Sequence, residues 1–240
     1  IGGMLESAPG QLSDNFPICA AALRDANARG YRVLVSVAKA PAWARSTSGE
    51  AAPPDDPQAL ADFFTLMLGE IGDSIHAVEI WNEPNLWREW NTSAYPFTGA
   101  GYMRLFEPSY RAIRASSPRM TIITAGLSPT ASGASSVNDR SYLRQMYQAG
   151  LDDYDDIAVG VHPYGWSNAP DERCCTASGR GWDDRGQFFF LDTLSAYRQI
   201  MYDNGHGDLN LWATEFGWPT YQDLPATAPE AWMVSLNSEQ

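Results

Sequence analysis

Short apolar runs alternate along this chain with longer stretches in which apolar residues recur at helical spacing. The short runs are rich in Val, Ile and Leu, and Gly, Pro, Asn or Asp residues bound them, which is typical of strands buried in a sheet. This pattern predicts strands at residues 32–37, 77–82, 120–125, 157–162 and 209–215.

The longer stretches between these runs have apolar residues three and four positions apart, as an amphipathic helix requires. They predict helices at residues 16–29, 57–71, 101–116, 139–148 and 188–204. Each strand is followed by a helix, and parallel strands need such crossover connections, so we expect a parallel sheet.

The predicted units indicate an α/β protein and a (β/α)8 TIM barrel that is incomplete in this chain. At about 44 residues per unit, eight units would need roughly 350 residues, whereas the chain has 240. We expect five or six parallel strands, with one or two strands missing before them and one after. Residues 1–3 resemble the end of a strand, and residues 235–240 resemble the start of a helix. A complete open sheet of five strands is the alternative.

Composition places the chain among globular proteins with one hydrophobic core. It is 44% hydrophobic, and no change of composition divides it, so we expect residues 1–240 to form a single domain. No apolar run reaches the roughly 18 to 20 residues that span a bilayer, and no signal-peptide pattern occurs.

The charge balance argues against nucleic-acid partners. The chain has 29 acidic and 16 basic residues, a net charge of −13, and Lys39 is its single lysine. Phosphate backbones would be repelled by such a surface. We therefore expect neither a nucleic-acid nor a membrane partner, although unpaired sheet edges would favour self-association.

Cysteine and histidine usage favours no metal and no cofactor. Cys19, Cys174 and Cys175 have no zinc-site spacing, and we predict that the adjacent pair are loop thiols, with pairing to Cys19 as the alternative. The chain has three histidines, and it lacks a phosphate-binding glycine loop.

Two predicted strands each deliver a glutamate at their carboxyl end: Glu83 directly follows the strand at 77–82, and Glu215 ends the strand at 209–215. Parallel strands end at the same rim of a barrel, where active sites form. Paired carboxylates can cleave a glycosidic bond, because one donates a proton while the other faces the positive charge that develops at the anomeric carbon. Alternation along a strand puts Glu79 and Trp81 on the same face as Glu83, with Glu79 roughly 13 Å deeper. We interpret Glu79 as a buried carboxylate paired with an arginine.

Three motifs at strand ends resemble those of the clan A glycoside hydrolases. They are Trp-Asn-Glu-Pro at 81–84, His-Pro-Tyr at 162–164 and Thr-Glu-Phe-Gly at 214–217. With Lys-Ala-Pro-Ala-Trp at 39–43, the pattern looks closest to family 39 and to cellulase-like members of family 5. The resemblance covers roughly residues 30–220. The second-strand arginine and eighth-strand tryptophan of the clan have no candidates here.

The resemblance implies a retaining mechanism with Glu83 as general acid/base and Glu215 as nucleophile. Asn82 would bind the sugar 2-hydroxyl, and His162 would line the subsite of the sugar to be cleaved. Tyr164 would donate a hydrogen bond that keeps Glu215 ionised. We expect the pKa of Glu83 to be raised, because burial and the neighbouring negative charge both disfavour its ionised form.

Loop aromatics predict the surface on which a sugar ring would stack. Trp43 and Trp218 stand closest to their strands and are the preferred candidates. The full set of seven is Trp43, Trp87, Trp90, Tyr95, Trp166, Trp182 and Trp218.

Together these features predict a retaining β-glycosidase that acts on oligosaccharides or polysaccharides without a cofactor. This substrate class favours an extracellular or periplasmic location. A non-catalytic or truncated carbohydrate-binding barrel is the alternative, because the same aromatics would serve it. A metal-dependent lyase or isomerase that uses Glu83, His162 and Glu215 as ligands is a third possibility.

Overall fold

A five-stranded parallel sheet forms the centre of the computed structural model, which describes residues 4–49, 51–175, 181–221 and 224–227. Every adjacent pair in this sheet is parallel, and the strands lie side by side in the order in which they occur in the sequence. The strands are β3 (Leu34–Val37), β4 (Ala77–Ile80), β5 (Thr121–Thr124), β6 (Ile157–Val161) and β7 (Asn210–Ala213).

The predicted helices are all present between these strands. Helices α2 and α5 have the predicted bounds, and the others differ by one or two residues at one or both ends. Hydrogen-bonding side chains fix where three of them begin, since Asp56, Thr98 and Asn138 each accept a bond from a backbone N–H of the first turn. The helices are α1 (Phe16–Ala28), α2 (Pro57–Ile71), α4 (Gly99–Ser116), α5 (Asp139–Gln148) and α6 (Phe190–Asp203).

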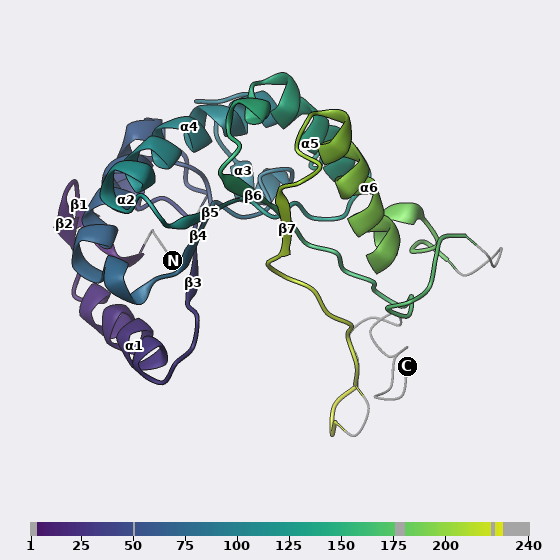
Figure 1. Cartoon of the computed structure of the whole chain (residues 1–240), viewed down its shortest axis with the longest axis horizontal. Coiled ribbons are helices and arrows are strands. Elements are labelled where there is room, and N and C mark those ends of the chain that lie inside the picture. Colours follow the sequence, from purple (N-terminus) through teal and green to yellow (C-terminus); the bar gives the residue numbers. More distant parts are fainter. Residues whose placement is uncertain (1–3, 50, 176–180, 222–223, 228–240) are drawn as a thin grey trace.

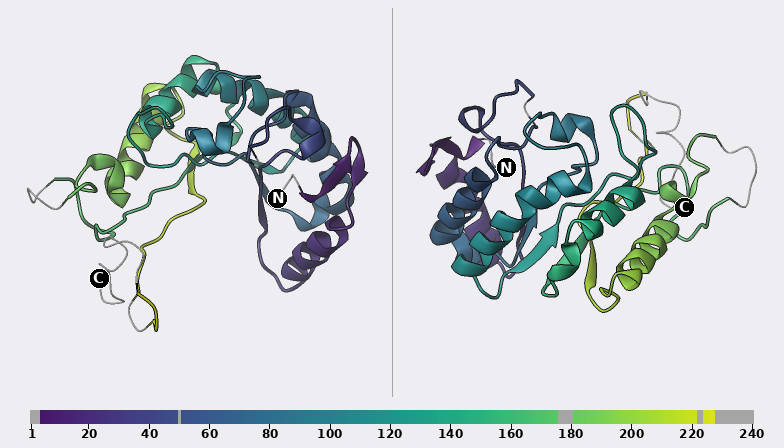
Figure 2. Two further views of the ribbon diagram at one scale, coloured as in Figure 1. Left: turned by 180° about the vertical axis from the view of Figure 1, so that it is seen from behind. Right: turned by 90° about the horizontal axis from the view of Figure 1, so that it is seen from above.

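The sheet curves as part of a barrel wall. Figure 1 shows the helices along the outer side of an arc with the strands inside it, and Figure 2 shows α2, α4, α5 and α6 in a row. A doubly wound open sheet has helices on both faces and a reversal in strand order. Consecutive strand order with helices on one side is the arrangement of a β/α barrel, so the prediction of a partial barrel with five parallel strands is confirmed.

Several short elements escaped the sequence pattern. A two-stranded antiparallel hairpin, β1 (Glu6–Ala8) and β2 (Gln11–Leu12), precedes α1. The short helix α3 (Trp87–Trp90) lies in the loop after β4. Elements of two to four residues are too short to show a period. The features expected at residues 1–3 and 235–240 lie outside the described residues.

The two faces of the sheet carry different layers. The large core cluster, which includes Val35, Val78 and Ile122, packs the sheet against the helices. The inner face has a separate small apolar cluster of Ala77, Ile123 and Ala158, with Leu34 and Trp212 against it. Because side chains alternate along a strand, the next inward positions above this cluster are Ser36 on β3 and Glu79 on β4. The apolar layer therefore lies below a polar one.

The two outer strands of the sheet are less covered than the central ones. All residues of β4 and β6 are buried, whereas β7 has exposed ends and β3 alternates between buried and half-buried residues. Among the described strands, β3 and β7 each have one neighbour, which agrees with a wall that does not close on itself.

One sequence prediction about the loops is wrong. Cys174 and Cys175 are joined in a disulfide rather than present as two thiols, while Cys19 is free.

None of the described helices combines the length and the apolar character needed to cross a bilayer.

Helix packing generates a matched pair of stability predictions. A Cβ added at Gly101 in α4 would collide with the Pro96 carbonyl, whereas a Cβ added at Gly69 in α2 meets nothing within 4 Å. We expect Gly101→Ala to destabilise the fold by about 1–3 kcal/mol through overpacking. Gly69→Ala should instead stabilise it by up to about 1 kcal/mol, because alanine favours the helix. Urea unfolding of both variants measures the difference, and equal effects would contradict this packing of α4.

Candidate functional site

The two glutamates of the predicted pair follow the carboxyl ends of β4 and β7. Strand β4 ends at Ile80 and β7 at Ala213, so both strands are shorter than predicted. Trp81 and Glu83 have positive φ angles of 74° and 40°, so the extended backbone of β4 does not continue to Glu83. The prediction that Trp81 shares the inner face with Glu83 is wrong, because Trp81 is fully buried in the core cluster on the helix side.

A buried histidine lies between the two glutamates. His162 follows β6 and is fully buried. Its Nδ1 is 3.2 Å from Glu83 Oε1 and 3.6 Å from Glu215 Oε2. One donor atom from each of these three residues lies within 4.8 Å of the others. The fold thus brings residues from the ends of β4, β6 and β7 to one point.

Each carboxylate also has a second partner. Tyr164 donates a hydrogen bond of 2.9 Å from its hydroxyl to Glu215 Oε2, the contact that the resemblance implied. Arg88 on α3 forms an ion pair with Glu83 through Nη2 and Oε2 at 3.0 Å. The Glu215 side chain is 45% exposed, whereas that of Glu83 is 8% exposed. The pair therefore has one enclosed member and one open to solvent.

The expected direction of the Glu83 shift is wrong. Burial raises the pKa of Glu83, but the hydrogen bond and charge of His162, with further bonds from Ser128 and Arg88, outweigh it, so the pKa is lowered overall. The sequence argument included burial and the neighbouring carboxylate, and it omitted these donors. A lowered pKa means that ionised Glu83 stabilises the fold at neutral pH, and this contribution is lost as the pH falls through the folded-state pKa.

The buried position of Glu79 is confirmed, but its predicted partner is wrong. Glu79 is 2% exposed. Its Oε1 accepts hydrogen bonds from the Thr214 hydroxyl at 2.7 Å and the Gly126 N–H at 2.9 Å. Within the part of the chain that the structure describes, no arginine pairs with it. Glu79 Oε1 also lies 4.0 Å from His162 Nε2, so it reaches the ring that contacts Glu83 and is less remote than predicted.

The Glu83, His162 and Glu215 atoms are close enough together to suggest a metal site. The Arg88 guanidinium already neutralises Glu83, and Tyr164 already bonds to Glu215. A cation placed there would have to compete with both groups. We therefore assign no metal ligands at this site.

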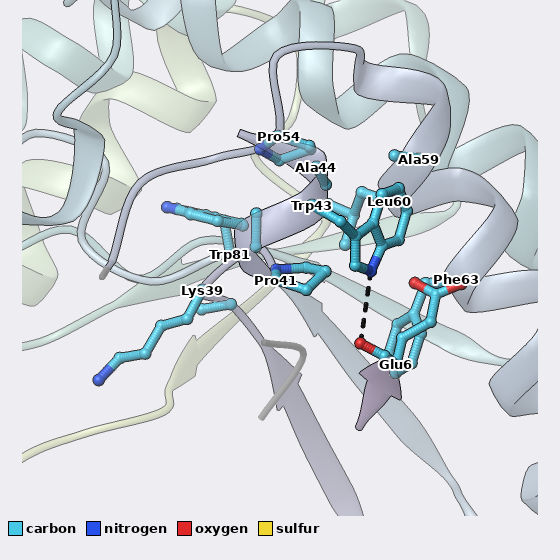
Figure 3. Close-up of a pocket in the computed structure, with 12 residues that line it drawn as sticks. Glu6, Lys39, Pro41, Trp43, Ala44, Pro54, Ala59, Leu60, Phe63 and Trp81 are labelled. Carbon is cyan, nitrogen blue, oxygen red and sulfur yellow. Dashed lines mark hydrogen bonds between the residues drawn. The ribbon is translucent and has the colours of Figure 1, made fainter. Parts of the chain in front are cut away.

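Two predicted substrate-binding residues lie near the rim. The Asn82 side chain is half-buried, and no described residue forms a hydrogen bond to it. Trp43 is 38% exposed and donates from Nε1 to the Glu6 carbonyl at 3.4 Å. Figure 3 shows its ring beside a crevice lined also by Trp81 and Pro41. Trp43 therefore keeps an accessible ring face beside an apolar crevice.

The other rim aromatics divide into accessible and buried groups. Trp218 is half-buried and donates from Nε1 to the Asn168 carbonyl at 2.7 Å, which fixes the orientation of its ring. Trp87 and Trp182 are 38% and 44% exposed, and Trp166 is half-buried. Two predictions are wrong, because Trp90 and Tyr95 are 0% and 6% exposed and pack in the core.

Sequence reasoning missed several residues of the site. Arg88 lies five positions after Glu83, and only the turn into α3 brings it back to that carboxylate. Thr214 stands inside a quoted motif, but its contacts with Glu79 and His162 depend on three different strands. Gly126 is required because a Cβ there would collide with the His162 ring. None of these contacts has a sequence signal of its own.

Solved glycoside hydrolases share this fold at low identity. No protein-family model and no curated protein matches the chain. A family 39 glycoside hydrolase from Bacteroides cellulosilyticus WH2 aligns with a TM-score of 0.62 at 19% identity. A family 39 β-xylosidase from Caulobacter crescentus aligns at 0.54 and 20% identity. A broad-specificity endoglucanase of family 5 from Clostridium longisporum aligns at 0.54 and 13% identity.

These alignments cover most of this chain and about half of each neighbour. The three neighbours cover 92%, 90% and 90% of the chain, which in turn spans 43%, 44% and 60% of theirs. The structural neighbours are thus TIM-barrel glycosidases of families 39 and 5, as the motifs indicated, and the chain matches a part of their barrel. The likeness establishes the fold.

The ion pair on Glu83 generates a prediction about its titration. Arg88→Gln removes one of the groups that stabilise ionised Glu83, so the pKa of Glu83 should rise. We expect a small rise, because Arg88 is largely exposed and solvent screens the pair. The Glu83 side-chain carboxyl carbon, followed by NMR across a pH titration, measures it. Arg111→Gln, which breaks an exposed pair with Glu107, is the control and should leave Glu83 unchanged.

Proposed function

We propose that this chain carries the reaction centre of a retaining β-glycosidase that acts on oligosaccharides or polysaccharides. The observation that carries the proposal is the spacing of Glu83 and Glu215, whose facing oxygens lie within 4.8 Å of each other and of His162 Nδ1. Retaining enzymes hold their carboxyl groups about 5–5.5 Å apart, whereas inverting enzymes need roughly 6.5–9.5 Å to admit a water. The short separation supports a double displacement.

In the first step Glu215 is the nucleophile. Its carboxylate forms a bond to the anomeric carbon while the bond from that carbon to the leaving oxygen breaks. Glu83 donates its proton to the leaving oxygen. The hydrogen bond from Tyr164 holds the Glu215 carboxylate in place, and the exposure of Glu215 gives the sugar access to it.

In the second step Glu83, now ionised, takes a proton from water. The water oxygen attacks the anomeric carbon, and the bond to Glu215 breaks. Groups that lower the pKa of Glu83 keep it in the ionised form that this step requires. The same groups oppose the first step. Arg88 is the most exposed of them. A bound sugar that displaces Arg88 would raise the pKa of Glu83 and so increase the protonated fraction that the first step needs.

Asn82, Trp43 and Trp218 would form the sugar-binding surface, and His162, which is fully buried, would position the two glutamates beside it. Asn82 is available to hydrogen-bond a sugar hydroxyl, and the accessible face of Trp43 provides a stacking platform. The three solved neighbours named above are described as a glycoside hydrolase, a β-xylosidase and an endoglucanase. A glycosidic substrate for this chain is part of the proposal.

A second candidate is a carbohydrate-binding barrel without catalysis, and the ion pair on Glu83 favours it. A carboxyl group whose pKa is lowered carries little proton at neutral pH, which weakens it as a general acid. Aryl β-glycosides separate the two functions. Release of the aryl alcohol supports the glycosidase, whereas sugar binding without release supports the binding protein. Activity that chelators abolish would instead favour a metal-dependent reaction.

The two carboxylates should respond differently to removal. Glu215→Ala should abolish formation of the glycosyl-enzyme, because no nucleophile remains. Glu83→Ala should slow substrates with poor leaving groups by about 10²–10⁴-fold and should spare those whose leaving group needs little protonation.

Added azide should restore turnover of Glu83→Ala as the β-glycosyl azide, identified by NMR. An α-azide formed by Glu215→Ala in the presence of azide is expected as the complementary product. Glu107→Ala, at an exposed position of α4, is the matched control and should retain full activity. Rescue of Glu83→Ala as the α-azide would reverse the roles.

A further inference from the structure

Glu79 is a buried carboxylate for which the proposed reaction has no use. It stands on the inner face of β4, above the apolar layer, and is 2% exposed. Burial raises its pKa, against hydrogen bonds from Thr214, Gly126 and Ser36 and the charge of His162. An isolated carboxylate at such a position would be costly unless it were paired. Its contacts lead directly to the ring that holds Glu83 and Glu215.

A line of three close contacts joins Glu79 to Glu83. Thr214 Oγ1 lies 2.7 Å from Glu79 Oε1 and 3.1 Å from His162 Nε2. At the other edge of the ring, His162 Nδ1 lies 3.2 Å from Glu83 Oε1. The line therefore runs from the Glu79 carboxylate through a hydroxyl and an imidazole to the Glu83 carboxylate.

Counting protons along this line limits its possible states. Three contacts need three protons, but the threonine hydroxyl supplies one and a neutral imidazole supplies one more. The third proton must be added to the group as a whole. The Thr214 hydroxyl donates to Glu79 Oε1 in the shortest of the three contacts, at 2.7 Å. With that proton facing Glu79, His162 Nε2 carries a proton to bond Thr214. The remaining contact needs one proton, on Nδ1 or on Glu83 Oε1. The Arg88 guanidinium on the other oxygen of Glu83 favours the ionised carboxylate, which leaves this proton on Nδ1.

The surroundings of the ring support this state. Three carboxylates surround it, with Glu79 on the Nε2 side and Glu83 and Glu215 on the Nδ1 side. Arg88 pairs with Glu83 through Oε2, the oxygen that does not contact the ring. Gly126 packs directly against both groups, because a Cβ at that position would collide with the ring and approach Thr214 Oγ1 to 2.8 Å.

We propose that Glu79 is a positioning residue that, through Thr214, holds His162 doubly protonated, so that the ring binds Glu83 and Glu215 together from its other edge. Glu79 does not touch the reacting atoms. It supplies the negative charge that retains the second proton on the ring. The effect on turnover rests on the proposed glycosidase function, but the state of the ring does not.

Replacing Glu79 with a neutral residue changes the pKa of Glu83, and the direction of that change depends on how Glu79 acts. If Glu79 acted only through space, replacing it with a neutral group would remove a negative charge near Glu83 and lower the pKa of Glu83. If it acts through the ring, the same replacement lets His162 lose its charge, and the pKa of Glu83 rises because its cationic partner is gone. The two explanations predict opposite directions.

Nitrogen-15 NMR of the histidine ring in the ligand-free chain tests the proposal without any substrate. At neutral pH we expect both His162 nitrogens to give the signals of protonated nitrogen. In Glu79→Gln, one nitrogen should give the signal of an unprotonated nitrogen. Thr214→Val, which breaks the line at its centre, should have the same effect and serves as the second variant if Glu79→Gln does not fold. Ser36→Ala removes another partner of Glu79 and keeps its charge, so this control should leave the ring unchanged.

The pH dependence of aryl glycoside turnover provides the second measurement. In Glu79→Gln, the alkaline limb should move to higher pH by roughly half a unit or more. Glu89→Gln neutralises a carboxylate that lies near Glu83 and also pairs with Arg88. Both effects favour ionised Glu83, so this variant should move the limb to lower pH. A singly protonated His162 in the unchanged chain, or a ring unaffected by both Glu79→Gln and Thr214→Val, would overturn the proposal. Absence of turnover with the expected ring spectra would overturn the glycosidase function alone.

Discussion

The site depends on one constraint, which is that a fully buried imidazole must satisfy carboxylates from two strand ends at once. His162 lies between Glu83 and Glu215 at the rim of the sheet, with Glu79 behind it. Like charges held this close are unfavourable unless a cation or shared protons lie between them. The ring therefore determines the spacing of the glutamates, and it lowers the pKa of Glu83 against the effect of burial. Gly126, which leaves room for the ring, is part of the same constraint.

The layering of the sheet explains how the chain keeps these groups buried. Small and apolar residues fill the lower inner face, and the polar layer begins one inward position higher. The helices cover the outer face of the same strands. A carboxylate such as Glu79 is tolerated because hydroxyl and amide donors surround it, which compensates for the loss of water. The rigid strands then deliver each donor to a fixed place.

The proposed reaction needs Glu83 first as an acid and then as a base. Different groups around it favour the protonated and the ionised form. Burial makes its proton easier to keep, whereas His162, Ser128 and Arg88 make it easier to lose. Arg88 differs from the other two because its side chain is 72% exposed and belongs to a four-residue helix. A group on so short and open an element is the one that a ligand could displace. The balance at Glu83 would thus depend on what occupies the site.

The sequence by itself determined the order and type of the main elements. Apolar runs and helical periods located five strands and five helices, because local burial patterns repeat along the chain wherever one face of an element is covered. Motifs at strand ends also identified Glu83, His162, Tyr164 and Glu215 as neighbours, since parallel strands end at one rim. The structure brings these four together.

Only the tertiary structure decided the charges and partners within that group. Arg88 returns to Glu83 through a turn too short to have a period, and Thr214 links Glu79 to His162 across strands that are far apart in the sequence. Trp90 and Tyr95 proved to be core residues, because composition cannot tell on which side of a loop a ring packs. Hydrogen bonds and pKa shifts depend on distances of a few ångströms between distant residues, and such distances exist only once the chain has folded.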